Sequence, residues 1–274
     1  MAESTVLHTL SVRNLYASYT GVNVLHGVSL AVHSGEIICL TGPNGSGKST
    51  LLSLLSGIPA DTLHIESADT MPEFDGTPIA SYSRKNTALH IACMAQDEQS
   101  AWNYTVRDIV LTGRYAHTVN GIYSLRDYEC VNRVIAEMGI EKLADRRIFS
   151  LSGGEAQKVR IARALAQEPD ILLLDEPVAN LDFGYQAELL SLIKNLAHGH
   201  KLGVLVSIHD LNTAARFADR IALLPRHGPC ITGTAEEVLT AENLSKAYGV
   251  QFGIYLHPVY HCPQVYTIQS VNSV

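Results

Sequence analysis

The sequence of 274 residues has no excess of basic side chains. Its 20 Lys and Arg residues stand against 27 Asp and Glu residues, so the formal net charge is −7. A surface that binds nucleic acid needs a surplus of cations to displace the counterions of the phosphate groups. We therefore expect no nucleic acid among the partners of this protein.

Long apolar runs are also missing. A helix that spans a membrane needs about 18 or more consecutive apolar residues, and the sequence has no such run. Residues 1–12 lack a basic segment followed by an apolar core, so they do not have the pattern of a signal peptide. Any role at a membrane is therefore expected to come through a partner chain.

The cysteines form neither a disulfide pattern nor a metal pattern. Their number, 5, is odd, and no Cys-x-x-Cys pair occurs, whereas disulfide frameworks and zinc sites use paired cysteines at recurring spacings. Two of them lie in apolar, strand-like runs. We expect reduced and mostly buried thiols, as in a cytosolic protein, at Cys39, Cys93, Cys130, Cys230 and Cys262.

What the sequence does contain is the glycine-rich segment GPNGSGKST at residues 42–50. It fits the pattern G-x-x-x-x-G-K-[ST] and lies between an apolar strand-like run and an apolar helix-like run. Glycines let successive backbone N–H groups converge on an anion, and a helix amino terminus adds its positive end. Lys48 can reach the β and γ phosphates, and Ser49 offers a hydroxyl to Mg²⁺. The predicted nucleoside triphosphate site comprises Gly42, Pro43, Asn44, Gly45, Ser46, Gly47, Lys48, Ser49 and Thr50.

A second group of polar residues follows the apolar run at residues 171–174. Asp175, at the tip of the expected strand, can bind the Mg²⁺ ion that Ser49 contacts. Glu176 is placed to accept a proton from a water molecule that attacks the γ phosphate. An apolar run followed by Asp-Glu is by itself a weak pattern, since many strands end in a solvated turn. Its occurrence together with the phosphate loop strengthens the prediction.

Between these two motifs stands LSGGEAQK, at residues 151–158, ahead of a helical pattern. A serine and two glycines at a helix amino terminus form another anion site. The order of LSGGE-x-Q-K and then LLLDEP resembles the ABC (ATP-binding cassette) ATPases, and the resemblance covers about residues 7–240. It implies that two cassettes enclose two ATP molecules head to tail, with one chain contacting its partner's ATP through Ser152, Gly153 and Gly154.

Other positions of the family pattern fall on single residues. The resemblance implies that Tyr19 stacks on adenine, although Tyr16 is close in the sequence. It implies that Gln96 contacts Mg²⁺ and the attacking water, and that Asp182 lies in a turn that crosses the dimer interface. His209 resembles the histidine that contacts the γ phosphate. The predicted cofactors are thus ATP and Mg²⁺, with catalytic residues Glu176, His209 and Gln96 and metal ligands Ser49, Gln96 and Asp175.

The alternation of strand and helix patterns around the phosphate loop predicts an α/β fold with a parallel central sheet. We expect a phosphate-loop NTPase core, an antiparallel β subdomain and a helical subdomain. Residues 7–32 suit antiparallel strands, residues 89–94 a buried strand and residues 106–145 mostly helices, while Pro and Gly predict loops over residues 58–78.

We expect one ABC ATPase domain over residues 1–274. Its parts are a nucleotide-binding core with the antiparallel strands at about 7–95 and 168–240, a helical subdomain with the signature motif at about 96–167, and a carboxy-terminal tail at about 241–274. In that tail, His257, His261 and Cys262 could in principle hold a metal ion, but the prolines beside them favour a loop.

One cassette without a membrane span fits the separate ATPase subunit of a bacterial-type importer. The resemblance implies a homodimer on the cytoplasmic side of the membrane, bound to permease subunits and served through them by an extracytoplasmic substrate-binding protein. Within the importers, residues 104–115, 209–220, 233–240 and 247–250 resemble the group that carries iron chelates, namely siderophores, haem and cobalamin. A zinc or manganese importer is the neighbouring alternative. A soluble ABC ATPase, such as one for iron–sulfur cluster assembly, is a further one.

Overall fold

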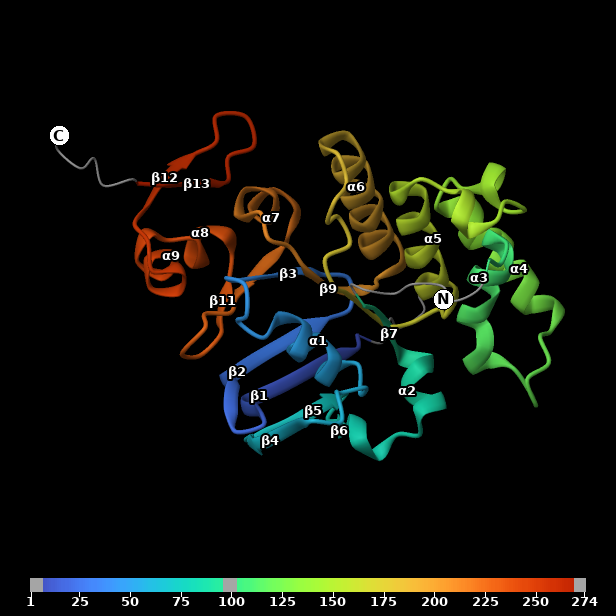
Figure 1. The fold of residues 1–274 in the computed structure, drawn as a ribbon, viewed down its shortest axis with the longest axis horizontal. Coiled ribbons are helices and arrows are strands. Elements are labelled where there is room, and N and C mark those ends of the chain that lie inside the picture. The colour runs from blue at the N-terminus through green and yellow to red at the C-terminus, as the bar shows by residue number, and fades with distance from the viewer. Residues whose placement is uncertain (1–6, 96–102, 269–274) are drawn as a thin grey trace, which may run out of the picture.

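A six-stranded sheet forms the centre of the molecule (Figure 1), whose computed structural model describes residues 7–95 and 103–268. The strand order is β11-β10-β3-β9-β8-β7, and all neighbours are parallel except β11, which pairs antiparallel with β10. The predicted α/β fold with a parallel central sheet is confirmed. The strands are β3 (Ile37–Thr41), β7 (Ile91–Met94), β8 (Ile171–Leu174), β9 (Gly203–Ser207), β10 (Arg220–Leu223) and β11 (Ile231–Gly233).

A second, antiparallel sheet has the order β2-β1-β5-β6, with β4 also paired to β1. The turn between β1 and β2 lies at Thr20 and Gly21, whose φ angles of 48° and 83° suit a tight reversal. The prediction of loops is confirmed over residues 58–62 but wrong over most of residues 63–78, because β4 and β5 pair with the distant β1 and the local Pro and Gly pattern does not reveal that partner. The strands are β1 (Thr9–Tyr19), β2 (Val22–His33), β4 (Leu63–Ser67), β5 (Thr70–Phe74) and β6 (Thr77–Pro78).

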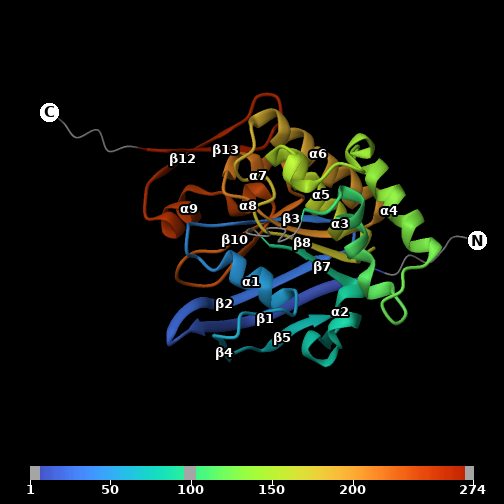
Figure 2. The same cartoon turned by 45° about the vertical axis from the view of Figure 1, so that its right-hand side comes forward.

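Helix α1 (Lys48–Leu55) lies between the two sheets (Figure 2). Successive residues of β3 serve two different cores, since side chains alternate along a strand. Ile38 and Leu40 join the core that contains α1 and the antiparallel sheet, whereas Ile37 and Cys39 join the core beneath the helices on the other face. Both faces of the parallel sheet are therefore covered at β3, which accounts for the continuous apolar run of residues 37–40 in this strand.

Three helices build the side of the molecule drawn in green and yellow-green in Figure 1. They are α3 (Val106–Thr112), α4 (Leu125–Glu137) and α5 (Gly153–Ala166), and short 3₁₀ helices connect them at Gly113–His117, Glu141–Leu143 and Ile148–Ser150. Val106, Val110, Val131 and Val134 are buried where these helices pack together. The helical spacing seen in the sequence is thus confirmed for α3 and α4.

The strand expected at residues 89–94 begins two residues later than predicted. Leu89 and His90 complete α2 (Arg84–His90), whose first turn is capped because the Ser83 hydroxyl accepts a hydrogen bond from the Asn86 amide at 3.2 Å. Only Ile91–Met94 pairs with β8. An apolar run that contains the end of a helix and the start of a strand looks the same in sequence as one continuous strand.

A buried ion cluster joins the 3₁₀ helix at Gly113–His117 to α4 and to the end of α5. The side chain of Arg114 is 1% exposed, and its Nε donates to Asp127 at 3.0 Å. Its Nη1 donates to the Ala166 carbonyl at 2.7 Å and to Glu168 at 2.8 Å. Burial acts to raise the pKa of Asp127, but hydrogen bonds from Ser124 and Arg114 outweigh it and hold that pKa below its usual value. Both carboxylates are therefore stabilised in their charged form.

The remaining helices cover the parallel sheet and lead into the tail. They are α6 (Phe183–His200), α7 (Leu211–Phe217), α8 (Ala235–Val238) and α9 (Ala241–Tyr248), followed by the hairpin of β12 (Phe252–Leu256) and β13 (Pro263–Thr267). The side chain of Asn212 on α7 forms two hydrogen bonds with the backbone of β13. Its Nδ2 donates to the Val265 carbonyl at 3.2 Å, and its Oδ1 accepts from the Val265 amide at 2.7 Å. The hairpin is thus fixed to the rest of the fold.

The tail does not gather its histidines and cysteine into a metal site. The Nδ1 atom of His257 accepts hydrogen bonds from the Val259 and Tyr260 amides at 3.1 Å, and Cys262 is buried. Within residues 7–95 and 103–268, no group of three or more His, Cys, Asp or Glu side chains could hold a metal ion. No helix in these ranges is both long and apolar enough to cross a membrane.

The five cysteines are buried or partly buried, as predicted. Burial raises the pKa of Cys39 above its usual value and that of Cys230 to about 12. These two thiols therefore stay protonated at neutral pH, which makes them poor nucleophiles.

Candidate active site

The structure brings most of the predicted nucleotide residues to the carboxyl edge of the parallel sheet. Strand β3 leads into the phosphate loop, β8 into Asp175 and Glu176, and β9 into Ile208 and His209. Because β9 lies between β3 and β8 and all three run parallel, their carboxyl ends meet at one edge. Segments more than a hundred residues apart in the sequence thus become neighbours.

The phosphate loop has a backbone that only glycine can supply. Gly42 and Gly47 have φ angles of 149° and 93°. A Cβ atom at Gly42 would lie 2.2 Å from the Leu224 carbonyl oxygen, and one at Gly47 would lie 2.8 Å from the Val24 carbonyl oxygen. Both contacts are with backbone atoms, which cannot move aside cheaply. The two glycines are therefore required by the fold of the loop as well as by its expected ligand.

Lys48 is buried at the amino terminus of α1, where its Nζ donates to the carbonyl oxygens of Gly42 at 2.9 Å and Pro43 at 3.2 Å. Burial lowers the pKa of Lys48, and the carboxylates of Glu176 and Asp175 act in the opposite direction. The buried hydroxyl of Ser46, in the same loop, makes no hydrogen bond to any residue that the structure describes. A cation, an unpaired hydroxyl and a helix amino terminus at one place form a donor set that fits a polyphosphate.

Ser207 forms hydrogen bonds with both acidic residues, and the sequence analysis did not predict this role. Its Oγ donates to Asp175 Oδ1 at 2.7 Å and accepts from the Glu176 amide at 2.7 Å. Asp175 is 5% exposed, so this hydroxyl supplies a needed partner for a buried carboxylate. The feature of the sequence that could have indicated this role is that Ser207 is the one hydroxyl residue in the otherwise apolar strand β9, two positions before His209.

His209 and Glu176 contact each other directly. The His209 Nε2 atom lies 2.5 Å from Glu176 Oε1. Glu176 has a φ of 49°, an unusual conformation for a residue with a side chain. The hydrogen bond from its amide to Ser207 and the contact with His209 hold Glu176 in this conformation.

A cavity of about 680 Å³ lies beside these residues and is lined by Tyr19, Ser49 and Asp175, among others. The two predicted Mg²⁺ ligands in the described chain therefore face the same space, and a hydroxyl and a carboxylate are suitable oxygen ligands. Tyr19 lines this cavity, whereas the ring of Tyr16 lies against Gly27. This arrangement favours Tyr19 over Tyr16 as the residue near a base. Gln96 lies outside the described residues.

The remaining predicted residues lie apart from the phosphate loop. Ser152 caps α5 in a reciprocal arrangement with Glu155, and these hydrogen bonds hold the pKa of Glu155 below its usual value. Asp182 caps α6, where it accepts a hydrogen bond from the Tyr185 amide at 2.9 Å. In the described chain, no hydrogen bond or ion pair joins residues 152–154 or Asp182 to residues 42–50.

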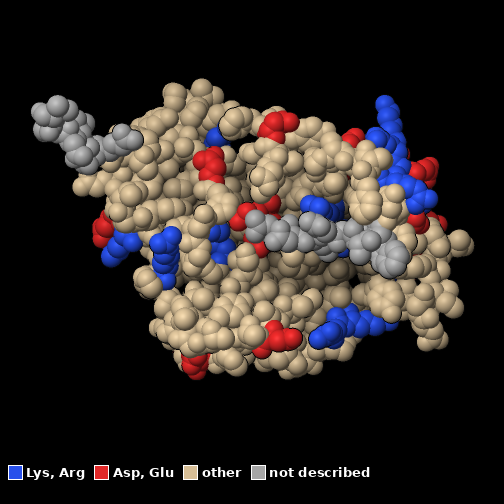
Figure 3. All heavy atoms as spheres, in the orientation of Figure 1, with Lys and Arg blue, Asp and Glu red and all other residues tan. Residues whose placement is uncertain are grey.

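The charges on the face seen in Figure 3 are unevenly distributed. Acidic side chains occur near its middle, and Lys and Arg lie in several separate groups. Two cations contact the phosphate loop in the described residues: the buried Lys48, and the exposed Arg226, whose Nε donates to the Asn44 carbonyl at 3.2 Å.

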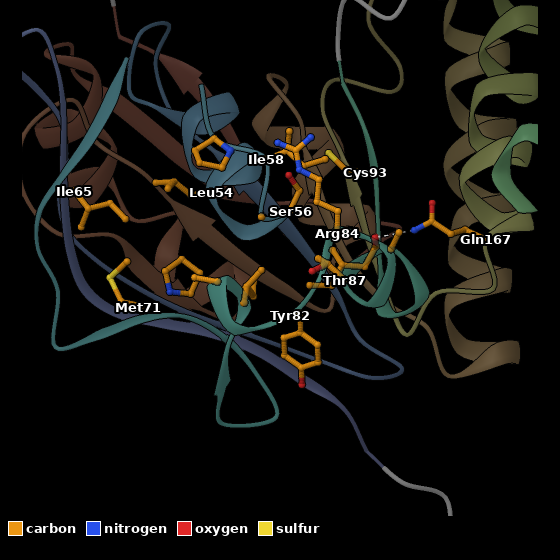
Figure 4. A pocket seen from close by; sticks show the side chains of 17 residues that line it. Leu54, Ser56, Ile58, Ile65, Met71, Tyr82, Arg84, Thr87, Cys93 and Gln167 are labelled. Atoms are coloured by element: carbon orange, nitrogen blue, oxygen red, sulfur yellow. Dashed lines mark hydrogen bonds between the residues drawn. The ribbon is translucent and has the colours of Figure 1, made fainter. Parts of the chain in front are cut away.

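A second cavity, of about 440 Å³, contains none of the predicted nucleotide residues (Figure 4). It lies beyond the carboxyl end of α1 and is mostly apolar, with Ile65 and Met71 on one side and Arg84 on another. The amide of Gln167 borders it and donates to the Ile91 carbonyl at 2.8 Å. Ser56, Ile58, Pro59 and Cys93 line both cavities, so the two cavities are direct neighbours.

Comparison with known proteins agrees with this geometry. The family model described as ABC transporter matches residues 25–179, which contain the phosphate loop, residues 152–154 and Glu176. A hemin import ATP-binding protein of Gloeobacter violaceus is 36% identical over 91% of this chain and 90% of its own length. A cobalamin import ATP-binding protein of Halobacterium salinarum is 34% identical over 91% of this chain and 61% of its own length.

A solved structure has the same fold. It belongs to a transporter described as metal-chelate type, in an inward-facing conformation, and matches with a TM-score of 0.79 and 29% identity over 96% of this chain and 98% of that chain. The sequence match, the shared fold and the phosphate loop beside two acidic residues lead to one conclusion. The chain belongs to the ABC transporter family and is one of its ATP-binding, ATP-hydrolysing chains.

Proposed function

We propose that this protein is the ATPase subunit of an importer for an iron chelate, such as a siderophore, haem or cobalamin. The observation that carries the ATPase part is the convergence of the phosphate loop, Asp175, Glu176 and His209 at one sheet edge. The importer part is supported by relatives that are named for the import of hemin and cobalamin. ATP hydrolysis then drives transport through a separate permease.

The phosphates of ATP bind to the backbone amides of the loop and to the Lys48 ammonium group. To reach them, Lys48 exchanges its hydrogen bonds with the Gly42 and Pro43 carbonyls for bonds to phosphate oxygens. Tyr19 stacks on the adenine ring. Ser49 and Asp175 would hold Mg²⁺, together with Gln96, and the ion would supply positive charge between the β and γ phosphates.

Glu176 orients the attacking water and takes up its proton. His209 contacts the γ phosphate and, through its Nε2, keeps the Glu176 carboxylate directed towards the reacting group. Ser207 fixes Asp175 and the Glu176 backbone with one hydroxyl, so both carboxylates keep their places during the reaction. Such fixed polar groups lower the barrier because they need little reorganisation in the transition state.

Two copies of the chain act together, head to tail. Ser152, Gly153, Gly154 and Asp182 make no hydrogen bond or ion pair with the phosphate loop of their own chain in the described residues. A second copy turned by a twofold axis would meet that loop with these residues, so that each ATP contacts both chains. Closed twofold dimers of this kind are the commonest form of homo-oligomer.

The chain acts as a single ABC ATPase domain over residues 1–274. Its nucleotide-binding core, with the antiparallel strands, spans about residues 7–95 and 168–240. The helical subdomain spans about 96–167, and a tail follows at about 241–274. This division assigns the phosphate loop to the core and Ser152 to the helical subdomain, so a rotation between the two would change the dimer interface.

The protein binds to the cytoplasmic side of a membrane through permease subunits, and an extracytoplasmic substrate-binding protein delivers the chelate to that permease. A tagged pull-down from detergent-solubilised native membranes, with mass spectrometry of the bound chains, tests this. We expect to recover a permease with many membrane helices. Recovery of a permease for free zinc or manganese would show that the transported substrate is a metal ion and not a chelate. Recovery of soluble partners alone would refute a role in transport.

Replacing Lys48 with Ala is expected to weaken ATP binding by about 10-fold or more, because a charge-assisted hydrogen bond contributes about 1.5–3 kcal/mol. The affinity is measured by titration with a fluorescent ATP analogue. Lys142, exposed in the Glu141–Leu143 turn, provides the control: Lys142→Ala is expected to bind as the parent does. An unchanged affinity in a folded Lys48→Ala protein would contradict the proposed role.

A further inference from the structure

The amino-terminal turns of α5 and α6 are joined by one aromatic ring. Tyr185, in the first turn of α6, lies against the backbone of Gly154, in the first turn of α5. A Cβ atom built at Gly154 would lie 2.7 Å from both Cδ1 and Cε1 of Tyr185. Such a separation is too short for two carbon atoms, so the ring occupies the place that any side chain at Gly154 would need.

Lys158 and Glu188 reinforce the same contact one turn further along each helix. The Lys158 Nζ atom lies 5.7 Å from the centre of the Tyr185 ring and 2.6 Å from Glu188 Oε1. The Lys158 side chain is 12% exposed, so its amine is held between the two helices. A cation over an aromatic ring and an ion pair each add a modest attraction. Together these contacts keep the two helix starts at a fixed separation.

The backbone of Tyr185 is tied to the turn that precedes it. Its amide donates to Asp182 Oδ1 at 2.9 Å, and the Gln186 side chain donates to the Leu181 carbonyl at 2.8 Å. The ring of Tyr185 thus contacts the Ser152–Gly154 segment while its backbone supports the turn at Asp182. These are the two segments that the proposed function assigns to the partner subunit's side of each ATP site.

We infer that Tyr185 is a positioning residue that sets the distance between the Ser152–Gly154 segment and the Asp182 turn, so that both meet the second copy of the chain at once. The inference rests on the head-to-tail dimer proposed above. It assigns Tyr185 no contact with ATP, and its ring carbons, not its hydroxyl, are the atoms that act. Loss of the ring therefore impairs association of two chains but leaves nucleotide binding by one chain unchanged.

The test uses Glu176→Gln protein as the parent, because ATP then persists in the dimer. Sedimentation velocity with ATP and Mg²⁺ measures dimer formation, and titration with a fluorescent ATP analogue measures the affinity of the single chain. We expect Tyr185→Leu to weaken ATP-dependent association by about 10- to 100-fold, the cost of misplaced binding groups. Nucleotide affinity should change less than about twofold, because the phosphate loop is untouched.

Two further variants make the result specific. Tyr185→Phe keeps the ring and is expected to dimerise as the parent does. Tyr128→Leu removes a partly exposed tyrosine from the first turn of α4 and is the matched control. If Tyr185→Leu does not fold, Tyr185→Met replaces it, because the unbranched Met side chain adapts to irregular gaps, with the same expected loss of association.

The outcomes separate this inference from the proposed function. A parent that dimerises with ATP, together with a Tyr185→Leu protein that associates equally well, would overturn the inference and leave the dimer in place. Equal losses of nucleotide affinity and association would also overturn it, because the ring would then support the whole fold. A parent that never dimerises would refute the head-to-tail dimer, and the inference with it.

Discussion

ATP turnover by the Glu176→Gln protein is expected to fall by about 100-fold or more, while ATP still binds. The amide of Gln has nearly the shape of the carboxylate, so the fold is preserved, but it cannot take up a proton from water. The contact between His209 and position 176 loses its charge and becomes weaker. Phosphate release measures turnover, and a fluorescent ATP analogue measures binding.

The control for this variant is Glu129→Gln, which makes the same chemical change on the exposed surface of α4. It is expected to hydrolyse ATP at the parent rate. Turnover that survives in the Glu176→Gln protein would show that another group accepts the proton. Loss of both ATP binding and turnover would instead show that the Glu176 carboxylate stabilises the phosphate loop. This outcome has a physical basis, because the negative charge of Glu176 raises the pKa of Lys48 and so favours its charged form.

Arg114→Ala is expected to lower the free energy of unfolding by about 3–5 kcal/mol, the cost of removing one partner from a buried ion pair. The substitution leaves the buried Asp127 without its guanidinium partner and removes the donor to the Ala166 carbonyl. Urea unfolding monitored by circular dichroism measures the shift in midpoint. Arg133→Ala is the control, because that guanidinium is 53% exposed and pairs with the same Glu168. Its expected cost is at most about 1 kcal/mol.

The effect of Arg114→Ala should depend on pH in a defined direction. The pKa values of Asp127 and Glu168 both lie below their ordinary values of 3.8 and 4.5, even though burial acts against the charged forms. A carboxylate with a lowered pKa adds stability that is complete above its ordinary pKa and is lost as the pH falls towards the lowered one. The difference in the free energy of unfolding between wild type and Arg114→Ala should thus have its full size above about pH 4.5 and become smaller below that pH. A difference that stayed constant to pH 3 would show that lost packing dominates.

The sequence predicted those parts of the fold and site whose signals are local. The phosphate loop, β8 with its two carboxylates, and the helix that follows Ser152 each carry their pattern within a dozen residues. The capping box at the start of α5 is readable in the same way, because Ser and Glu three residues apart satisfy each other's backbone groups.

What the sequence did not reveal depends on contacts between distant segments. Strand β4 has mostly exposed residues and β5 contains Pro72, so neither has a clear strand pattern, and both are strands because they pair with β1. Ser207 has a role only because β9 lies beside β8, which brings its hydroxyl to Asp175. The contact between Tyr185 and Gly154 likewise arises from the packing of two helices that no local pattern connects.

The strand order also bears on how the protein is made. On the ribosome, β3 and β8 emerge before β9, yet β9 takes the place between them in the finished sheet. Until about residue 207 has been synthesised, the nascent chain has two apolar strands with unpaired edges, and such edges invite association with other chains. The insertion of β9 between β3 and β8 also brings the phosphate loop next to Asp175 and Glu176. A product that stops before β9 therefore exposes the edges of β3 and β8 and lacks the strand that brings the phosphate loop to the acidic pair, so completion of the ATP site depends on synthesis through β9.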